Sequence, residues 1–277
     1  MKSKKNIKYG FILIVLIALY IAFIVMTGLL GDKGKEPEII APSSVLEVSV
    51  EDKEDVLLKG IKATDDEDGN ISDKVFIESF SAFDDNKQRT VTYAVFDSDD
   101  HLVRTTRQIK YSDYTAPVFD IDEALCYYYY LSSNEEYKNF VSAESCVDGD
   151  LSSKITVEKN YYKDNVHYVD YSVTDSCGTK ESLTLKADEL NKNPNVEITL
   201  KKYLKRVKKG TTITEIAPRS NMEEIKVMDM VDDTLKAEVE VTHNYNPDVP
   251  GTYEFIYRLS KSNGDYGYTK LVVIVEE

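Results

Sequence analysis

Acidic residues gather at two places in the first half of the chain and could bind a divalent cation. Asp66 and Asp68 lie in the acidic run 65–68, and Asp97 and Asp99 lie in a later polar segment. Calcium takes about six to eight oxygen ligands, and carboxylates are its usual protein donors. These four aspartates are therefore the candidate calcium ligands, in a site made of two loops and a linker.

The same residues also have a purely structural explanation. Asp68 precedes Gly69, and an Asp–Gly pair is typical of a tight turn in which the Asp bonds to its own backbone and the Gly takes a positive φ. An EF-hand loop is excluded, because counting back from Gly69 puts Thr64 at its first ligand position. A second Asp–Gly pair, Asp148-Gly149, lacks the additional acids, and this favours the turn over the cation.

Other residues with possible chemistry carry weaker signals. The tyrosine run 127–130 could stack on sugars, but on a strand alternate tyrosines point to opposite faces, so only two would be exposed. His101, His167 and His243 have no second ligand at metal-binding spacing, and we expect them at the surface. The sequence holds no zinc-protease, nucleophile-elbow or phosphate-loop motif, so we expect no enzyme.

One cassette occurs twice in the chain and a third time in altered form. A period of about 80 residues is too long for a solenoid repeat and suits a string of small independent β domains. The copies span residues 68–75 with 93–98, residues 148–155 with 171–176, and residues 232–239 with 257–260.

Within each copy, apolar residues recur with period 2. Val91, Tyr93 and Val95 would form one face of a strand, and similar alternation surrounds Tyr171 and Tyr257. This pattern indicates half-buried antiparallel strands, and short strands at this spacing predict β-sandwiches. Beyond the predicted membrane span, helical periodicity is absent. Residues 222–230 would form one helical turn at most.

The N-terminus predicts a membrane anchor. Four lysines precede an uncharged run, residues 11–30, which is long enough to cross about 30 Å of hydrocarbon as a helix. A cleaved signal peptide is the alternative, but its apolar region is usually shorter and ends at a small-residue cleavage site. The lysines place the N-terminus inside the cell, so we expect the bulk of the chain outside the cell membrane.

The charge of the chain restricts its partners. The formal net charge is −15, which repels nucleic acid and anionic lipid. The expected partners are therefore the membrane, through the single span, and an unknown protein or glycan on a cell surface.

Two motifs resemble a known family. The segment 63–71 (ATDDEDGNI) is similar to the first motif of a bacterial immunoglobulin-like surface repeat family, which also occurs beside cadherin-like modules and pesticidal crystal proteins. The segment 171–179 is similar to its second motif, and Thr115-Ala116-Pro117 to its inter-repeat segment. The resemblance covers the first two repeats well and implies tandem extracellular Ig-like modules for adhesion or display on a Gram-positive cell. It implies no reaction.

The repeat alignment also predicts a disulfide between Cys146 and Cys177. These cysteines align with Asp66 and Asp99 of the first repeat, in loops beside the two motifs, and an exported protein can oxidise them. The alternatives are the pair Cys126–Cys146 and unpaired thiols. By the same alignment, Asp66 and Asp99 should face each other.

The sequence thus predicts an all-β protein with an N-terminal transmembrane helix and three tandem Ig-like antiparallel β-sandwich domains. We expect a non-catalytic surface protein that binds an envelope or host component; the alternative is a structural stalk or an accessory subunit of an envelope complex. No cofactor is expected apart from the calcium considered above. The predicted segments are a cytoplasmic tail (1–10), the span (11–30), a linker (31–44) and three domains (45–113, 114–189 and 190–277).

Overall fold

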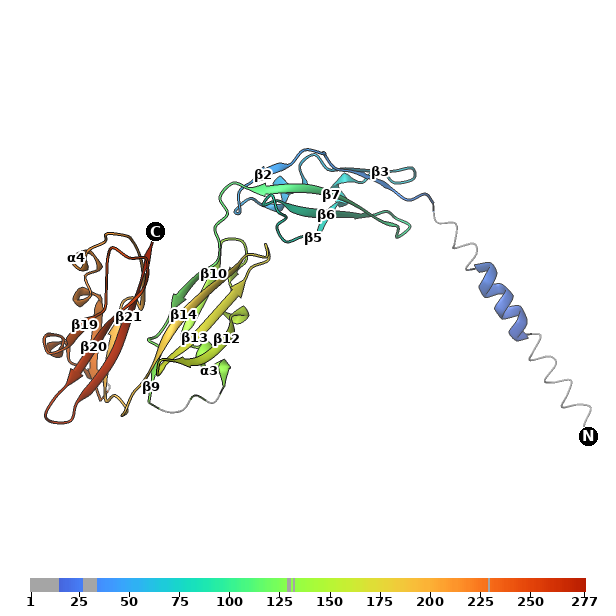
Figure 1. Cartoon of the computed structure of the whole chain (residues 1–277). Coiled ribbons are helices and arrows are strands. Elements are labelled where there is room, and N and C mark those ends of the chain that lie inside the picture. Colours follow the sequence, from blue (N-terminus) through green and yellow to red (C-terminus); the bar gives the residue numbers. More distant parts are fainter. Residues whose placement is uncertain (1–14, 27–33, 129–130, 132, 229) are drawn as a thin grey trace, which may run out of the picture. The chain divides into compact units, whose positions relative to one another are not determined.

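The computed structural model describes residues 15–26, 34–128, 131, 133–228 and 230–277. The chain divides into two compact units, residues 1–112 and 113–277 (Figure 1). Strands in mainly antiparallel sheets dominate the described parts of both units, which confirms the all-β class.

The predicted membrane span falls only in part on described residues. Residues 15–26 are helical with exposed side chains, whereas residues 11–14 and 27–30 of the span lie outside the described residues. The predicted tail 1–10 and the first linker residues, 31–33, also lie outside them. In the described part of the chain, no helix is both long enough and apolar enough to cross a membrane.

The first unit places its described strands in two sheets. One sheet has the order β1-β3-β4, and the other has the order β2-β7-β6-β5. The elements are β1 (Glu38–Ile40), β2 (Leu46–Val48), α2 (Glu54–Leu58), β3 (Lys62–Asp65), β4 (Gly69–Asn70), η1 (Ser72–Lys74), β5 (Phe76–Phe80), β6 (Arg89–Phe96) and β7 (Leu102–Tyr111).

The second unit begins with the same arrangement. Its first two sheets have the orders β11-β10-β8 and β12-β13-β14-β9 among the described residues. The elements are β8 (Val118–Ile121), β9 (Cys126–Tyr127), α3 (Asn134–Lys138), β10 (Val141–Ser145), β11 (Gly149–Asp150), η2 (Ser152–Lys154), β12 (Thr156–Lys163), β13 (Val166–Thr174) and β14 (Lys180–Glu189).

The rest of the second unit forms one further sheet. Its order is β18-β17-β15-β21-β20-β19, and β16 also pairs with β21. The elements are β15 (Val196–Leu200), β16 (Leu204–Lys208), α4 (Ile213–Ile216), η3 (Arg219–Asn221), β17 (Met222–Val227), β18 (Met230–Val231), η4 (Asp233–Ala237), β19 (Glu240–His243), β20 (Gly251–Ser260) and β21 (Tyr266–Glu276).

Two expectations about helices were wrong. Residues 222–227 form strand β17 rather than a helical turn, because Ile225 pairs with Ile198 of β15 and both are buried. Helices α2, α3 and α4 were missed because four or five residues are too few to show a helical period. Their signal is instead local: acids occupy the first turn of each, and Thr212 and Glu215 form a capping box on α4.

Parallel pairing joins the beginning and the end of each repeat. Strand β2 pairs in parallel with β7, β9 with β14, and β16 with β21. The remaining long ladders, such as β6 with β7 and β13 with β14, are antiparallel, as the period-2 pattern predicted.

A fully buried tyrosine occupies the equivalent strand of every repeat. Tyr93 on β6, Tyr171 on β13 and Tyr257 on β20 are each 0% exposed. Each hydroxyl donates to a backbone carbonyl in or next to the short helix of its repeat: to Leu57 at 2.8 Å, to Tyr137 at 2.9 Å and to Pro218 at 2.7 Å, respectively. The predicted strand register is thereby confirmed, and each bond ties a helix to a central strand.

The buried apolar residues form three clusters, one in each repeat. The cluster of the middle repeat also contains Leu204 and Val272 from the last one, so the two hydrophobic cores of the second unit are in contact. The division into three separate domains at the predicted boundaries stays a prediction.

Replacing Tyr171 tests the tyrosine bond. Tyr171→Phe should destabilise the chain by about 0.5–1.5 kcal/mol, because the carbonyl of Tyr137 would lose its short hydrogen bond from the hydroxyl and keep only the longer one from the backbone N of Phe140 at 3.5 Å. Tyr171→Ala should cost about 3–5 kcal/mol, because it also leaves a cavity. Urea unfolding of the full chain gives both values. Tyr168→Phe, on the same strand but only half-buried, is the matched control; an equal loss there would contradict this explanation.

Candidate functional site

The two Asp–Gly motifs hold the loop that follows the long strand of their repeat. Asp68 Oδ2 accepts from the backbone N of Ser98 at 2.7 Å, and Asp148 Oδ2 accepts from that of Ser176 at 2.6 Å. The bond from Ser98 lowers the pKa of Asp68. Gly69 has a φ of +71°, as the turn required. The two halves of the cassette recur together because they meet in space.

The carboxylate of Asp97 makes its hydrogen bonds within its own loop. Asp97 Oδ1 accepts from the backbone N of Asp99 at 2.9 Å and from that of His101 at 2.8 Å. Asp97 Oδ2 lies 2.6 Å from His101 Nδ1. Burial raises the pKa of Asp97, but these hydrogen bonds outweigh it and the pKa lies below its usual value. This loop is therefore closed without a cation.

The other two predicted ligands point to different partners. Asp66 pairs with Lys35 at 2.6 Å, and Asp99 accepts from the backbone N of Gly34 at 3.1 Å. The acidic neighbour of Asp99 is Glu67, whose pKa is raised by that charge, and not Asp66 as the alignment suggested. Among the described residues, no group of three or more His, Cys, Asp or Glu could hold a metal ion. The structure thus does not bring the four aspartates into one metal site.

The structure shows no disulfide among the described cysteines, and the bridge between Cys146 and Cys177 stays a prediction. Cys146 is exposed, and its Sγ donates to the carbonyl of Thr115 at 3.1 Å. Cys177 is 1% exposed. Burial raises the pKa of Cys126 to about 12. Cys146 therefore differs from the other two in its access to solvent.

A buried ion cluster connects the two repeats of the second unit. Lys270 on β21 is 1% exposed, and its Nζ donates to the carbonyl of Lys186 at 2.6 Å and to Asp188 and Glu254 at 2.7 Å each. Lys186 Nζ lies 2.8 Å from the second oxygen of Asp188. Two cations thus face two carboxylates. Lys186 and Asp188 belong to β14 of the middle repeat, whereas Glu254 and Lys270 belong to the last repeat.

The ion cluster makes stability depend on pH in one direction. Burial raises the pKa of Asp188, but the charge of Lys270 and the hydrogen bonds from both lysines outweigh it, so this pKa lies below its usual value. A lowered carboxyl pKa contributes stability above about pH 4, and this is lost as the pH falls through the folded-state pKa.

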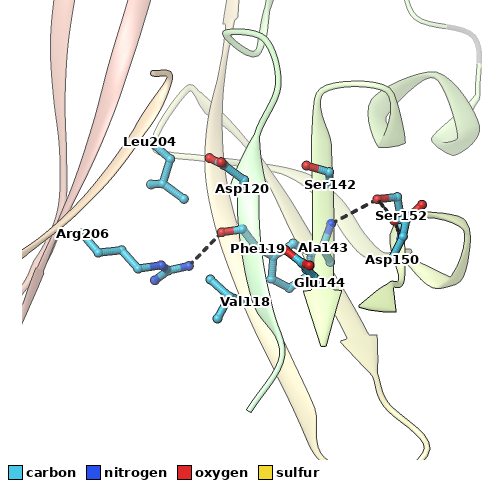
Figure 2. Close-up of a pocket in the computed structure, with 10 residues that line it drawn as sticks. All are labelled: Val118, Phe119, Asp120, Ser142, Ala143, Glu144, Asp150, Ser152, Leu204 and Arg206. Atoms are coloured by element: carbon cyan, nitrogen blue, oxygen red, sulfur yellow. Dashed lines mark hydrogen bonds between the residues drawn. The ribbon is translucent and has the colours of Figure 1, made fainter. Parts of the chain in front are cut away.

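One cleft of about 530 Å³ lies beside edge strand β8 (Figure 2). The guanidinium of Arg206 donates to the carbonyl of Phe119 at 3.3 Å, and Asp120 Oδ1 accepts from the backbone N of Ile121 at 2.8 Å. Both bonds occupy backbone groups of β8. They protect the edge against pairing with another strand, which explains these polar residues without a ligand.

A second cleft, of about 440 Å³, is lined by aromatic side chains and is called the aromatic cleft below. The ring of Tyr162 is stacked on that of His167, with centroids 4.6 Å apart and an interplanar angle of 13°. The Tyr162 hydroxyl donates to Glu189 at 2.9 Å. Its lining includes Tyr127, Tyr137, Glu158, Lys159, Asn160, Tyr162, His167 and Glu189.

His167 was expected at the surface, but it is 5% exposed. It is buried because both ring nitrogens find partners: Nε2 bonds to Asn160 Oδ1, and Nδ1 lies 2.7 Å from the hydroxyl of Tyr127. Burial lowers the pKa of His167, which favours the neutral ring. Since Asn160 Oδ1 only accepts, Nε2 carries the proton and Nδ1 accepts from Tyr127.

The tyrosine run contributes to the aromatic cleft at one position. Tyr127 is 6% exposed and belongs to the cleft, whereas Tyr128 is 49% exposed. This alternation agrees with the expected change of face, and residues 129 and 130 lie outside the described residues. Sequence reasoning missed Tyr162, although it lies in a second pair of adjacent tyrosines, Tyr161-Tyr162.

No family model and no curated protein matches this chain. Among solved structures it is similar to CBM51-2 in complex with GlcNAc and INT domains from Clostridium perfringens ZmpB, at 22% identity over 55% of this chain and 42% of that chain, with a TM-score of 0.23. It is also similar to human CDH23 EC21-23, at 10% identity over 87% of this chain and 100% of that chain, with a TM-score of 0.21. The chain thus spans less than half of the first of these. With TM-scores this low, neither likeness assigns a family or a ligand.

Removing Lys270 tests the ion cluster. Lys270→Met should destabilise the chain by about 3–5 kcal/mol, because Asp188 and Glu254, whose side chains are each only 13% exposed, would lose their fully buried cation. Urea unfolding at pH 7 measures the loss. Lys261→Met, which removes a more exposed pair with Glu238, should cost less than about 1 kcal/mol. Similar losses of stability for both variants would show that burial does not strengthen the ion cluster.

Thiol labelling tests the state of the cysteines. At pH 8, iodoacetamide should modify Cys146 rapidly and the other two slowly, because Cys177 is buried and Cys126 has a raised pKa. Peptide mapping by mass spectrometry identifies the labelled residue, and Cys146→Ser should abolish the rapid phase. If Cys146 and Cys177 react only after reduction, the protein carries the bridge that the repeat alignment predicted.

Proposed function

We propose that this chain is a membrane-anchored extracellular protein whose β-sandwiches, of the Ig-like type, bind a component of the cell envelope or of a host surface without catalysis. The aromatic cleft carries this proposal. Five of its side chains, Tyr127, Asn160, Tyr162, His167 and Glu189, are linked by hydrogen bonds, so it offers a fixed, partly apolar concave surface. Its volume lies in the usual range for small-ligand sites, about 300–1,000 Å³.

The hydrogen bonds of the aromatic cleft support binding rather than turnover. A general base needs an available lone pair and a pKa near the working pH. Both nitrogens of His167 are occupied, by Asn160 and Tyr127, and burial lowers its pKa. The hydrogen bonds hold the imidazole in place as part of the wall.

The N-terminal segment supports the anchor. All described residues of the helix 15–26 are exposed, including Leu16, Tyr20 and Phe23, each at 57% or more. A helix that is apolar on every side is stable when a nonpolar medium surrounds it. The lysines before residue 11 would then remain on the inner side, and both units would lie outside.

A structural stalk is the second candidate, and the buried ion cluster favours it. Lys270 on β21 makes two short hydrogen bonds to β14, to the carbonyl of Lys186 and to Asp188, and apolar contacts between the two cores accompany them. Such an interface fixes the spacing of the two repeats of the second unit. This would suit a spacer as well as a binding protein.

Retention of envelope material separates these two functions. The detergent-solubilised full chain, immobilised on beads, should retain a component of cell envelopes from the producing organism or of a host-cell surface. Tyr162→Ala should lower the retained amount about tenfold, because Tyr162 forms the exposed wall of the aromatic cleft. Tyr161→Ala, on the opposite face of β12, should leave it unchanged. Equal retention by the Tyr162 variant and the unmodified chain would place the binding outside the aromatic cleft, and no retention by either would favour the stalk.

A further inference from the structure

The ring of Tyr162 has one face open to solvent, and its other face packs against the imidazole of His167. Its side chain is 61% exposed, yet its ring lies flat on His167 and its hydroxyl is bonded to Glu189 at 2.9 Å. The imidazole covers one face, so the exposed area belongs mainly to the opposite face and the edge. A ligand that stacks there finds the ring already in position.

The support beneath Tyr162 is rigid. His167 is bonded at both nitrogens and makes an edge-to-face contact with Tyr137, with centroids 5.8 Å apart and an angle of 83°. Tyr127 contacts Tyr137 in the same way, at 6.2 Å and 90°. Little side-chain entropy remains to be lost when a ligand binds, which raises the affinity available from a small contact.

The fold does not require these aromatic residues. His167 pairs with Ala187 on the neighbouring strand, and the first unit has Arg89 paired with Ile109 at the corresponding place, counted from the buried tyrosine of each repeat. Arg89 is 3% exposed, and its Nε donates to the carbonyl of Ser81 at 2.7 Å. The same sandwich position is therefore filled by a guanidinium in one repeat and by an aromatic stack in the other.

The chemistry around the open ring face selects a ligand class. A flat aromatic face fits the C–H face of a sugar ring, and nearby amide and carboxylate groups can bond to its hydroxyls. Asn160 and Glu189 supply such groups beside Tyr162. Glu158 and Glu189 outnumber Lys159 on the walls, and the chain has a net charge of −15, so polyanions are repelled.

We propose that the aromatic cleft is a binding site for a neutral carbohydrate, with one pyranose ring stacked on the outer face of Tyr162 and its hydroxyls bonded to Glu189 and Asn160. This site rests on the proposed binding function and specifies its ligand class. The ring of Tyr162 provides the contact, and His167 is a positioning residue beneath it.

A glycan array tests the ligand class. The full chain in detergent should bind one or more neutral glycans composed of hexoses or N-acetylhexosamines, and should bind none of the polyanionic ones. For the best neutral glycan, Tyr162→Ala should weaken binding measured by titration calorimetry about tenfold or more, whereas Tyr162→Phe should weaken it less because the ring remains. Tyr161→Ala is the matched control, since that ring stacks on Tyr168 and lies outside the aromatic cleft. Thermal melts of the two Tyr162 variants should match that of the unmodified chain, because Tyr162 is exposed.

Several outcomes would overturn the proposal: no neutral glycan bound, equal affinity of the Tyr162→Ala variant, or a preference for polyanions. Envelope retention then shows which inference has failed. If periodate treatment of the envelopes leaves retention intact and protease treatment abolishes it, the ligand is a protein, and the binding function stands without the carbohydrate site. If nothing is retained, both fail.

Discussion

The buried tyrosine hydroxyl is the constraint around which each repeat is organised. A phenol in the centre of a sandwich must find a hydrogen-bond partner, because an unsatisfied hydroxyl there costs about 1–3 kcal/mol. In all three repeats the partner is a backbone carbonyl in or beside a short helix. The helix has only four or five residues and is marginal alone. One side chain thus fixes the strand, the helix and the connection between them.

The features that sequence could predict are those carried by local pattern. Period-2 alternation gave the central strands and the inward face of Tyr171, and the Asp–Gly pair gave a turn with positive φ at Gly69. The two halves of the cassette recur together because they are hydrogen-bonded to each other, a contact that the sequence alone does not show. Asp68 and Ser98 are distant in the chain, but the carboxylate of Asp68 accepts from the backbone N of Ser98, so the loop after the long strand depends on Asp68.

The features that sequence could not predict depend on contacts between distant strands. Lys270 lies in a run that reads as an ordinary strand, and only the approach of β14 and β20 surrounds it with carboxylates. His167 looked like a lone surface histidine, because its partners lie on other segments: Tyr127 on β9 and Asn160 on β12. Conversely, the aspartates that resembled a calcium site use their oxygens on nearby backbone N–H groups, and composition alone does not distinguish these two uses.

The parallel pairing of the second and last strands in a repeat affects how tension would act on it. Pulling the two ends of the first unit apart would slide β2 along β7, so the ladder at Leu46–Val48 would be loaded in shear, with its hydrogen bonds strained together. A hairpin pulled from its open end instead loses one bond at a time. Survival under force depends on the rate of unfolding more than on equilibrium stability. The same pairing of β9 with β14 and of β16 with β21 gives each successive repeat this mechanical geometry.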